Sequence, residues 1–194
     1  MKKSYSENIH QWIMLTLQGN RNAFTQIYYE TIDDASNLVY TLLIDKSQKE
    51  DILQEIYLET YKSLSKFDCN QSFRPWFIGI VIRQTKNFLR KRGLLFRLRD
   101  KIMKNQETTF VQDFSEKIVE KLDNVPLQRL IENLSFKLKT VIVLRYLYDY
   151  SLEEMSTILD IPLGTVKSRI SYALSILRKK IKSKKDVEGD YYGT

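Results

Sequence analysis

The spacing of apolar residues along the chain predicts helices almost throughout. Apolar side chains recur every three or four residues over long stretches, and only 3 prolines and 6 glycines are found among the 194 residues. In the first half we predict helices over residues 6–18, 22–29, 35–44, 47–66 and 74–92. Ser47 and Glu50 have the spacing of a capping box for the fourth of these helices, and Gly93 is expected to end the fifth.

The C-terminal third combines a short helix, a tight turn and a longer basic helix. Ser151 and Glu154 form a second capping-box pattern, which predicts a helix over 152–159. A turn at 160–162 and a helix over 163–182 follow, and two further helices precede them near 127–134 and 138–146. The apolar face of the last helix repeats at four, four, three and four residues: Val166, Ile170, Leu174, Leu177 and Ile181. This order of elements is typical of a DNA-binding helix-turn-helix.

Hydroxyl and basic side chains lie mainly off that apolar stripe, near the start of the last helix. Small hydroxyls let a helix approach the major groove, and Lys or Arg reaches base edges or phosphates. The candidate DNA-binding residues of this helix are Thr165, Lys167, Ser168, Arg169, Ser171 and Tyr172. An amphipathic helix with a solvated basic face would show the same periodicity, but the cap, the turn and the apolar faces together favour DNA binding.

Composition narrows the class of protein. The formal charge is +7, with 31 Lys and Arg against 24 Asp and Glu, which favours a polyanionic partner. A single cysteine, Cys69, and a single histidine, His10, exclude a disulfide framework and argue against a zinc site. We find neither a signal peptide nor an apolar run of bilayer length, and expect a soluble cytoplasmic protein. The sequence also contains no Gly-rich phosphate loop, no metal-ligand spacing and no Ser/His/Asp set. We therefore expect a protein that is not an enzyme and that uses neither a cofactor nor a small-molecule substrate.

A change in charge predicts the domain boundaries. Nine basic residues and one acidic residue occupy 83–104, whereas 105–126 holds five acids and two lysines. We therefore predict an all-α protein with two small helical domains, 1–104 and 127–185, joined by a flexible linker at 105–126. Residues 186–194 offer little to bury and are expected to form a disordered tail.

Two parts of the sequence resemble a known family. Residues 134–146 and 150–169 are similar to region four of bacterial sigma factors, and Gly-Thr-Val-Lys-Ser-Arg at 164–169 is the most specific piece. Residues 51–57, 67–68 and 72–77, with the basic run to 92, resemble region two of the same family. With these two regions and a short linker, the chain resembles an extracytoplasmic-function (ECF) sigma factor over residues 20–92 and 127–182.

The resemblance assigns a polymerase-binding surface to the helix predicted at 47–66. Region two of such factors docks on a coiled coil of the largest polymerase subunit, through a helix with the pattern Asp-x-x-Gln-Glu. The matching face carries two carboxylates, an amide and a leucine, which suit a basic partner surface: Asp51, Gln54, Glu55 and Leu58. Without the resemblance, this face would be interpreted as an ordinary solvated helix surface.

The resemblance also assigns capture of the melted minus-ten promoter element to the loop at 67–73 and the helix after it. Promoter opening needs a pocket for an unstacked base, a stacking surface and cations along the single strand. The candidates are Asn70, Gln71, Arg74, Trp76, Arg83, Lys86, Asn87 and Arg90. The amides of Asn70 and Gln71 can read a flipped base, whereas core packing is the favoured role for Trp76 and Phe77. Arg83 and Asn87 replace the Asn and Asp of many relatives, which leaves the preferred minus-ten sequence open.

The function implied by the resemblance is that of a dissociable promoter-specificity subunit of bacterial RNA polymerase. Its implied partners are core polymerase, duplex minus-thirty-five DNA, melted minus-ten DNA and an anti-sigma factor, which in this family is often membrane-bound. The alternative is a one-component transcription regulator that uses the same helix-turn-helix without polymerase. Gel shifts with and without core polymerase would separate the two.

Overall fold

The N-terminal half of the protein folds into four α-helices. The computed structural model describes residues 5, 8–43, 45–103, 131 and 133–189, and in these residues all regular secondary structure is helical. The helices are α1 (Ile9–Leu17), α2 (Arg21–Leu42), α3 (Lys49–Ser63) and α4 (Phe73–Met103), with short 3-10 turns at Lys46–Gln48 and Leu64–Lys66. The all-α prediction is confirmed. The predicted domain boundaries stay a prediction, because the linker lies outside the described residues.

Helix α2 replaces the two separate helices predicted at 22–29 and 35–44, so that prediction is wrong. The polar stretch between them contains neither Gly nor Pro, and its side chains have partners inside the fold. The Thr31 hydroxyl donates to the Ile27 carbonyl at 2.7 Å and lies 2.9 Å from the Tyr57 hydroxyl. A buried hydrogen-bonded threonine lets the helix continue through a segment that looks like a break in the sequence.

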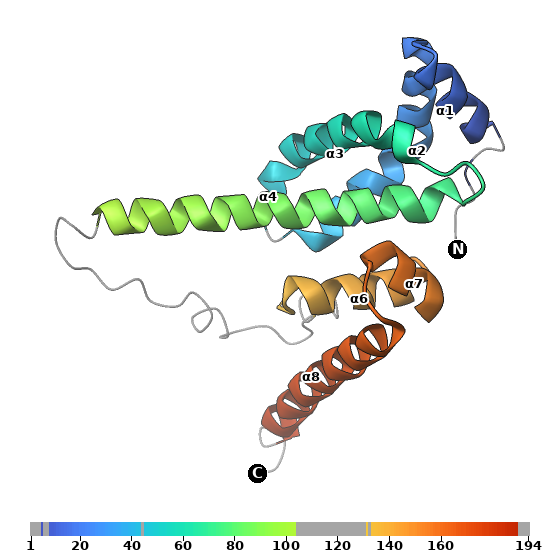
Figure 1. The fold of residues 1–194 in the computed structure, drawn as a ribbon. Helices are drawn as coiled ribbons and strands as arrows, with labels where there is room; N and C mark the ends of the chain where they lie inside the picture. The colour runs from blue at the N-terminus through green and yellow to red at the C-terminus, as the bar shows by residue number, and fades with distance from the viewer. Residues whose placement is uncertain (1–4, 6–7, 44, 104–130, 132, 190–194) are drawn as a thin grey trace.

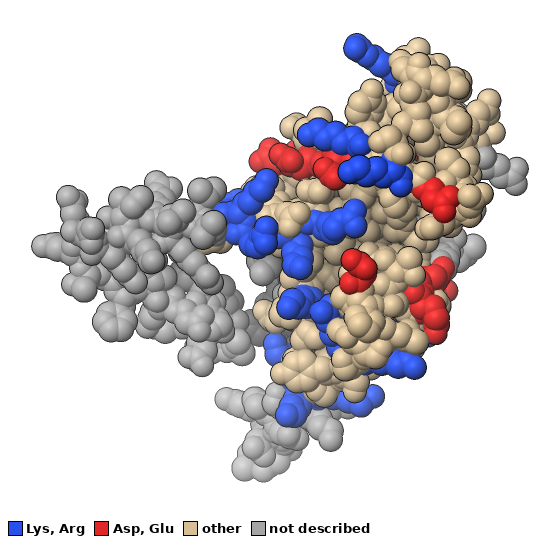
Figure 2. All heavy atoms as spheres, in the orientation of Figure 1, with Lys and Arg blue, Asp and Glu red and all other residues tan. Residues whose placement is uncertain are grey.

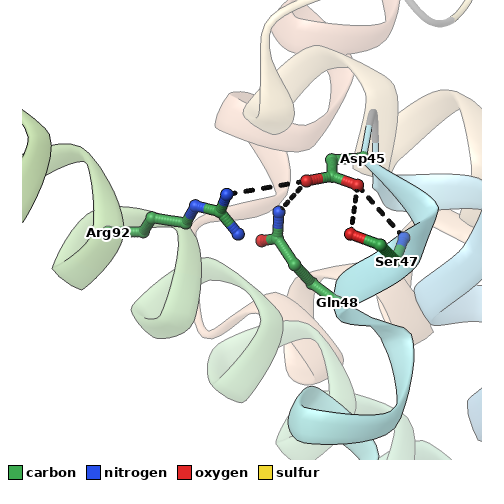
Figure 3. Close-up of polar contacts among 4 residues, drawn as sticks. All are labelled: Asp45, Ser47, Gln48 and Arg92. Carbon is green, nitrogen blue, oxygen red and sulfur yellow. Dashed lines mark hydrogen bonds and ion pairs between the residues drawn. The ribbon is translucent and has the colours of Figure 1, made fainter.

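The start of α3 also differs from the predicted Ser47–Glu50 capping box. Asp45 is the capping residue: its carboxylate accepts hydrogen bonds from the Ser47 backbone N–H at 3.1 Å and the Ser47 hydroxyl at 2.6 Å (Figure 3). Gln48 also donates to Asp45, and Arg92 of α4 pairs with it at 3.6 Å. A carboxylate two residues upstream is a stronger acceptor than the serine, and it folds a 3-10 turn before α3 begins.

Helix α4 continues to Met103, so Gly93 does not end it as predicted. A mid-helix glycine costs only about 1 kcal/mol relative to alanine. The residues around Gly93 are mostly good helix formers, among them arginines, lysines and leucines. The cost of one glycine is therefore too small to end a helix of this length.

The C-terminal half matches the predicted helix-turn-helix closely. It contains α6 (Phe136–Tyr146), α7 (Leu152–Leu159) and α8 (Leu163–Gly189). Both hydrogen bonds of the Ser151–Glu154 capping box form, at 2.8 and 3.1 Å, and Asp160 turns the chain with a left-handed φ of 50°. Helix α8 runs past the predicted end at 182. The helix predicted near 127–134 and the end of the tail fall largely outside the described residues.

Helix α4 lies between the other N-terminal helices and the C-terminal module α6–α8 (Figure 1). One core of buried residues spans both halves, and includes Ile56 and Phe77 from the first half and Met155 and Val166 from the second. A smaller aliphatic cluster joins α6 and α8: Leu134, Leu138, Ile142, Ala173 and Leu177. Ala173 thus takes a core position that the predicted stripe omitted, whereas Ile181 is 40% exposed.

Candidate nucleic-acid interface

The candidate recognition residues of α8 lie off its buried face. Val166, Ala173 and Leu177 point into the core. The predicted DNA-binding side chains are exposed at Lys167, Ser168, Ser171 and Tyr172 and half-buried at Thr165 and Arg169. The Ser168 hydroxyl donates to the Thr165 carbonyl at 3.0 Å, which keeps it close to the helix. Helical periodicity therefore brings these six residues to one accessible side, as the sequence predicts.

The loop before α4 is organised by Asp68, a residue outside the predicted set. Its carboxylate accepts from the Asn70 backbone N–H at 2.9 Å, from the Asn70 amide at 3.0 Å and from the Gln71 amide at 3.3 Å. These hydrogen bonds lower the pKa of Asp68 below its ordinary 3.8. An Asp in a polar loop commonly accepts from the backbone N–H two residues on, which is the Asx-turn, so the sequence did contain the clue.

An aromatic cluster supports this loop. The Phe67 ring lies 5.4 Å from that of Phe73 and 5.0 Å from that of Trp76, between ring centroids. His10 of α1 stacks on Phe67 at 6.0 Å, and its Nε2 lies 3.3 Å from the Gln71 carbonyl oxygen. Trp76 is half-buried in this cluster and Phe77 is fully buried, which agrees with the core role favoured for both.

Arg74 does not lie on the exposed side of α4 with the other candidates. Its side chain is 9% exposed, and its Nε donates to the Asp34 carboxylate of α2 at 3.0 Å. The rings of Tyr148 and Tyr150, from the loop before α7, lie 5.9 and 5.5 Å from its guanidinium carbon. Burial raises the pKa of Tyr150 to about 12. The sequence placed Arg74 among DNA-facing residues because its ion-pair partner is 40 residues away and leaves no local signal.

The remaining candidates of α4 form a polar stripe. Arg83, Lys86 and Arg90 are exposed and Asn87 is half-buried, at spacings that put them on one face of a helix. Arg83 and Lys86 line a cleft of about 270 Å³, together with Lys137 of α6 and Arg169 of α8. Figure 2 shows Lys and Arg side chains gathered over this part of the molecule, across both halves. The two candidate DNA surfaces thus meet at one cationic cleft.

The candidate polymerase-binding residues lie on the outer face of α3. Asp51, Gln54 and Glu55 are exposed, and Leu58 is 56% exposed although it is apolar. On the opposite face, Ile52 and Ile56 are fully buried. Tyr61, one turn after Leu58, is 50% exposed, and its ring packs edge-on against that of Phe24, with 5.0 Å between the centroids. It therefore adds an aromatic ring close to this surface.

Two further features concern metal binding and membrane insertion. Among the described residues, no group of three or more His, Cys, Asp or Glu side chains could hold a metal ion. In the same part of the chain, no helix is both long enough and apolar enough to cross a membrane.

Comparison with known proteins matches both halves of the chain to one family. The family described as Sigma-70 region 2 matches residues 28–94, and the family Sigma-70, region 4 matches residues 124–177. The ECF RNA polymerase sigma factor SigW of Bacillus subtilis is 31% identical over 172 residues, which cover 85% of this chain and 92% of SigW. The ECF RNA polymerase sigma-E factor of Haemophilus influenzae is 30% identical, with coverage of 84% and 90%.

Solved structures show the same fold at lower identity. CnrH, solved in complex with the cytosolic domain of CnrY, has a TM-score of 0.62 at 18% identity and covers 91% of this chain and 99% of its own. RpoE of Bartonella quintana, solved with the anti-sigma factor NepR, has a TM-score of 0.60 at 20% identity, with coverage of 82% and 96%.

A region-two module followed by a region-four helix-turn-helix defines a promoter-recognition factor of bacterial transcription. The chain belongs to the ECF RNA polymerase sigma factors. It is an alternative sigma factor, which directs core RNA polymerase to specific promoters and initiates transcription. The family match favours this function over that of a one-component regulator.

Proposed function

We propose that α8 reads the minus-thirty-five element as duplex DNA through the major groove. The observation that carries this assignment is the accessible face of Lys167, Ser168 and Arg169 beside a turn that follows a complete capping box. Lys and Arg are the side chains best suited to guanine edges and phosphates, and each base contact contributes about 1–3 kcal/mol of discrimination. Thr165, Ser171 and Tyr172 flank these residues and would contact the sugar-phosphate backbone of the DNA.

The loop at Asp68–Gln71 and the stripe on α4 are the proposed minus-ten surface. Asp68 occupies amide donors of Asn70 and Gln71, so their amide oxygens remain to accept from the exposed edge of a captured base. Arg83, Lys86 and Arg90 would neutralise phosphates of the melted strand, with Asn87 among them. Arg74 and Trp76 support this surface from inside as positioning residues, since one is buried in an ion pair and the other is packed among aromatic rings.

The outer face of α3 is the proposed contact with core polymerase. Asp51 and Glu55 present carboxylates to a basic partner, while Gln54 adds hydrogen bonding and Leu58 an apolar anchor. A Glu55→Lys change should weaken holoenzyme assembly, measured as retention of labelled chain by immobilised core polymerase. Glu153→Lys is the matched control, because Glu153 is an exposed carboxylate in the first turn of another helix, α7, away from the proposed face. Equal retention of the two variants would remove Glu55 from the contact.

The proposed factor acts in the cytoplasm by binding alone, without covalent chemistry of its own. A single exposed cysteine suits a reducing compartment. Two solved structures with this fold were determined in complex with CnrY and with the anti-sigma factor NepR. We infer that an anti-sigma factor, in a membrane-anchored or a free form, also regulates this chain.

In vitro transcription from a randomised promoter library with core polymerase tests the assignment of α8. Lys167→Ala and Arg169→Ala should each lower selection of the preferred minus-thirty-five sequence by about 5- to 150-fold, which corresponds to 1–3 kcal/mol. Lys179→Ala removes the same charge from an exposed position further along α8 and should leave the preferred sequence unchanged. Unchanged selection in both recognition variants would show that another surface reads this element.

A further inference from the structure

The only histidine in the sequence lies beside the loop that is proposed to capture the minus-ten base. His10 belongs to α1, and the match to Sigma-70 region 2 begins at residue 28, so the family comparison assigns no role to this helix. Ile9 and Ile13 of α1 are 3% and 0% exposed and belong to the core, and the helix packs on α2. These two anchors hold α1, and with it the half-buried imidazole, at a fixed place in the fold.

The imidazole of His10 contacts both ends of this loop. Its ring stacks on that of Phe67, with 6.0 Å between the centroids and 12° between the planes. Its Nε2 lies 3.3 Å from the Gln71 carbonyl oxygen, and because a carbonyl can only accept, the imidazole donates this hydrogen bond. Residues 68–70 lie between the two contacts, so one side chain of α1 bridges the loop from its first residue to Gln71.

Gln71 is held at three points. Its backbone N–H donates to the Asp68 carbonyl at 2.9 Å, and its side-chain amide donates to the Asp68 carboxylate at 3.3 Å. The hydrogen bond from His10 fixes a third group, the backbone carbonyl, which neither contact with Asp68 involves. The peptide that follows Gln71 is therefore oriented from α1, whereas Asp68 orients the turn that precedes it.

A second ring from the N-terminal segment supports the same region. The centroid of the Tyr5 ring lies 6.2 Å from that of Phe73, which in turn lies 5.4 Å from that of Phe67. The Tyr5 centroid also lies 5.8 Å from the guanidinium carbon of Arg74. Phe73 and Arg74 are the first two residues of α4. The N-terminal segment thus contacts the loop and the start of the helix that carries the proposed minus-ten stripe.

We propose that His10 is a positioning residue for promoter opening, which holds the loop at residues 67–71 in the shape that captures the unstacked minus-ten base. Capture of a base costs its stacking in the duplex, and a loop that is already ordered adds no ordering cost of its own. His10 touches no DNA in this role and acts through Phe67 and Gln71. The inference rests on the proposed function of the loop and adds α1 to the elements that promoter opening needs.

The mobility of the loop tests the His10 contacts without DNA. Cys69 lies within the loop, is exposed and is the only cysteine in the sequence, so a nitroxide label attaches to the full chain at that residue alone. His10→Ala should narrow the electron paramagnetic resonance lines of this label, because the loop loses a contact at each end. Gln11→Ala, at the exposed neighbouring position of α1, is the matched control and should leave the lines unchanged. Equal line widths for His10→Ala and the parent chain would overturn the proposal.

The rate of open-complex formation with core polymerase tests the consequence for promoter opening. His10→Ala should slow opening by about five- to tenfold, the size expected from one hydrogen bond and one ring contact, whereas Gln11→Ala should open at the parent rate. His10→Phe keeps the ring and His10→Gln keeps an N–H donor, so each should recover part of the lost rate. If both opened as slowly as His10→Ala, the two contacts would not position the loop and the proposal would be overturned.

A substitution at Asn70 separates failure of this inference from failure of the proposed function. Asn70→Ala removes the amide that is proposed to read the captured base and leaves both partners of His10 in place. If Asn70→Ala slows opening and His10→Ala does not, the positioning role is overturned while the assignment of the loop stands. If neither variant slows opening, the assignment of the loop to minus-ten capture fails, and the positioning role fails with it.

Discussion

The two modules of this sigma factor are stabilised in different ways. The N-terminal module combines a network of aromatic rings with a buried ion pair between α2 and α4. The C-terminal module has a small aliphatic cluster of its own, and Tyr150, Met155 and Ile158 pack into the core shared with the N-terminal helices. The difference teaches that the minus-thirty-five reader depends on the other module for part of its packing, so separation of the two exposes apolar surface.

The two proposed DNA surfaces also differ in what holds their side chains in place. In the loop before α4, one carboxylate holds the two amide residues in place. On α8, the helix itself sets the directions of Lys167 and Arg169, and within the described part of the chain neither side chain forms an ion pair. Side-chain hydrogen bonds organise the loop, whereas the helical backbone organises the face of α8. A single substitution should therefore disturb the geometry of the loop more than that of the α8 face.

The largest expected effect is the loss of the buried ion pair in the N-terminal module. Arg74→Ala leaves the Asp34 carboxylate buried without its partner and should lower the free energy of unfolding by about 3–5 kcal/mol. Urea denaturation followed by circular dichroism measures this change. Arg83→Ala, at an exposed position of the same helix, should stay within about 0.5 kcal/mol of the parent chain. Similar midpoints for both variants would contradict a stabilising role for the Arg74 pair.

A smaller effect is expected from the helix caps. Ser151→Ala removes the capping box of α7 and should cost about 1 kcal/mol of unfolding free energy. Ser47→Ala should cost less, because Asp45 rather than Ser47 caps the turn before α3. The same denaturation experiment compares the two, and a larger loss for Ser47→Ala would reverse the assignment of the caps.

The side-chain organisation of the loop predicts an effect on promoter opening with little effect on stability. Asp68→Ala removes the acceptor that holds Asn70 and Gln71 and should slow open-complex formation several-fold, whereas Asp68→Asn keeps one acceptor oxygen and should be affected less. Permanganate reactivity of promoter thymines with core polymerase reports the rate. An identical rate for Asp68→Ala and the parent would mean that the loop needs no preorganisation.

The smallest expected effect is a loss of folding stability at acid pH. Hydrogen bonds lower the pKa of Asp45 and Asp68 below the ordinary 3.8, so their charged forms stabilise the fold above that pH. This stabilisation is lost as the pH falls through the lowered values. Urea midpoints at pH 5, 4 and 3 should therefore fall more steeply for the parent chain than for Asp45→Asn, which has no proton to gain there. If the urea midpoints of the two chains fell equally steeply with pH, Asp45 would not contribute to this pH-dependent stability.

The sequence alone determined the helix-turn-helix and the side of α8 that carries the recognition residues. Ser151, Glu154 and the turn at Asp160 act within a few residues of one another, and helical periodicity separates Val166 from Lys167 without reference to the rest of the fold. These local signals predicted the bounds of α7 residue for residue.

Only the tertiary structure decided where Arg74 lies, how α2 continues through its polar centre, and that the two DNA surfaces meet. Each of these outcomes depends on a partner distant in sequence, such as Asp34 for Arg74, Tyr57 for Thr31, and Ile158 for Gly79. A buried polar side chain is placed by the partner that satisfies it, and such a partner has no fixed spacing along the chain. For that reason the sequence identified the parts of the promoter reader, and the packing of α7 on α4 determined how they are held.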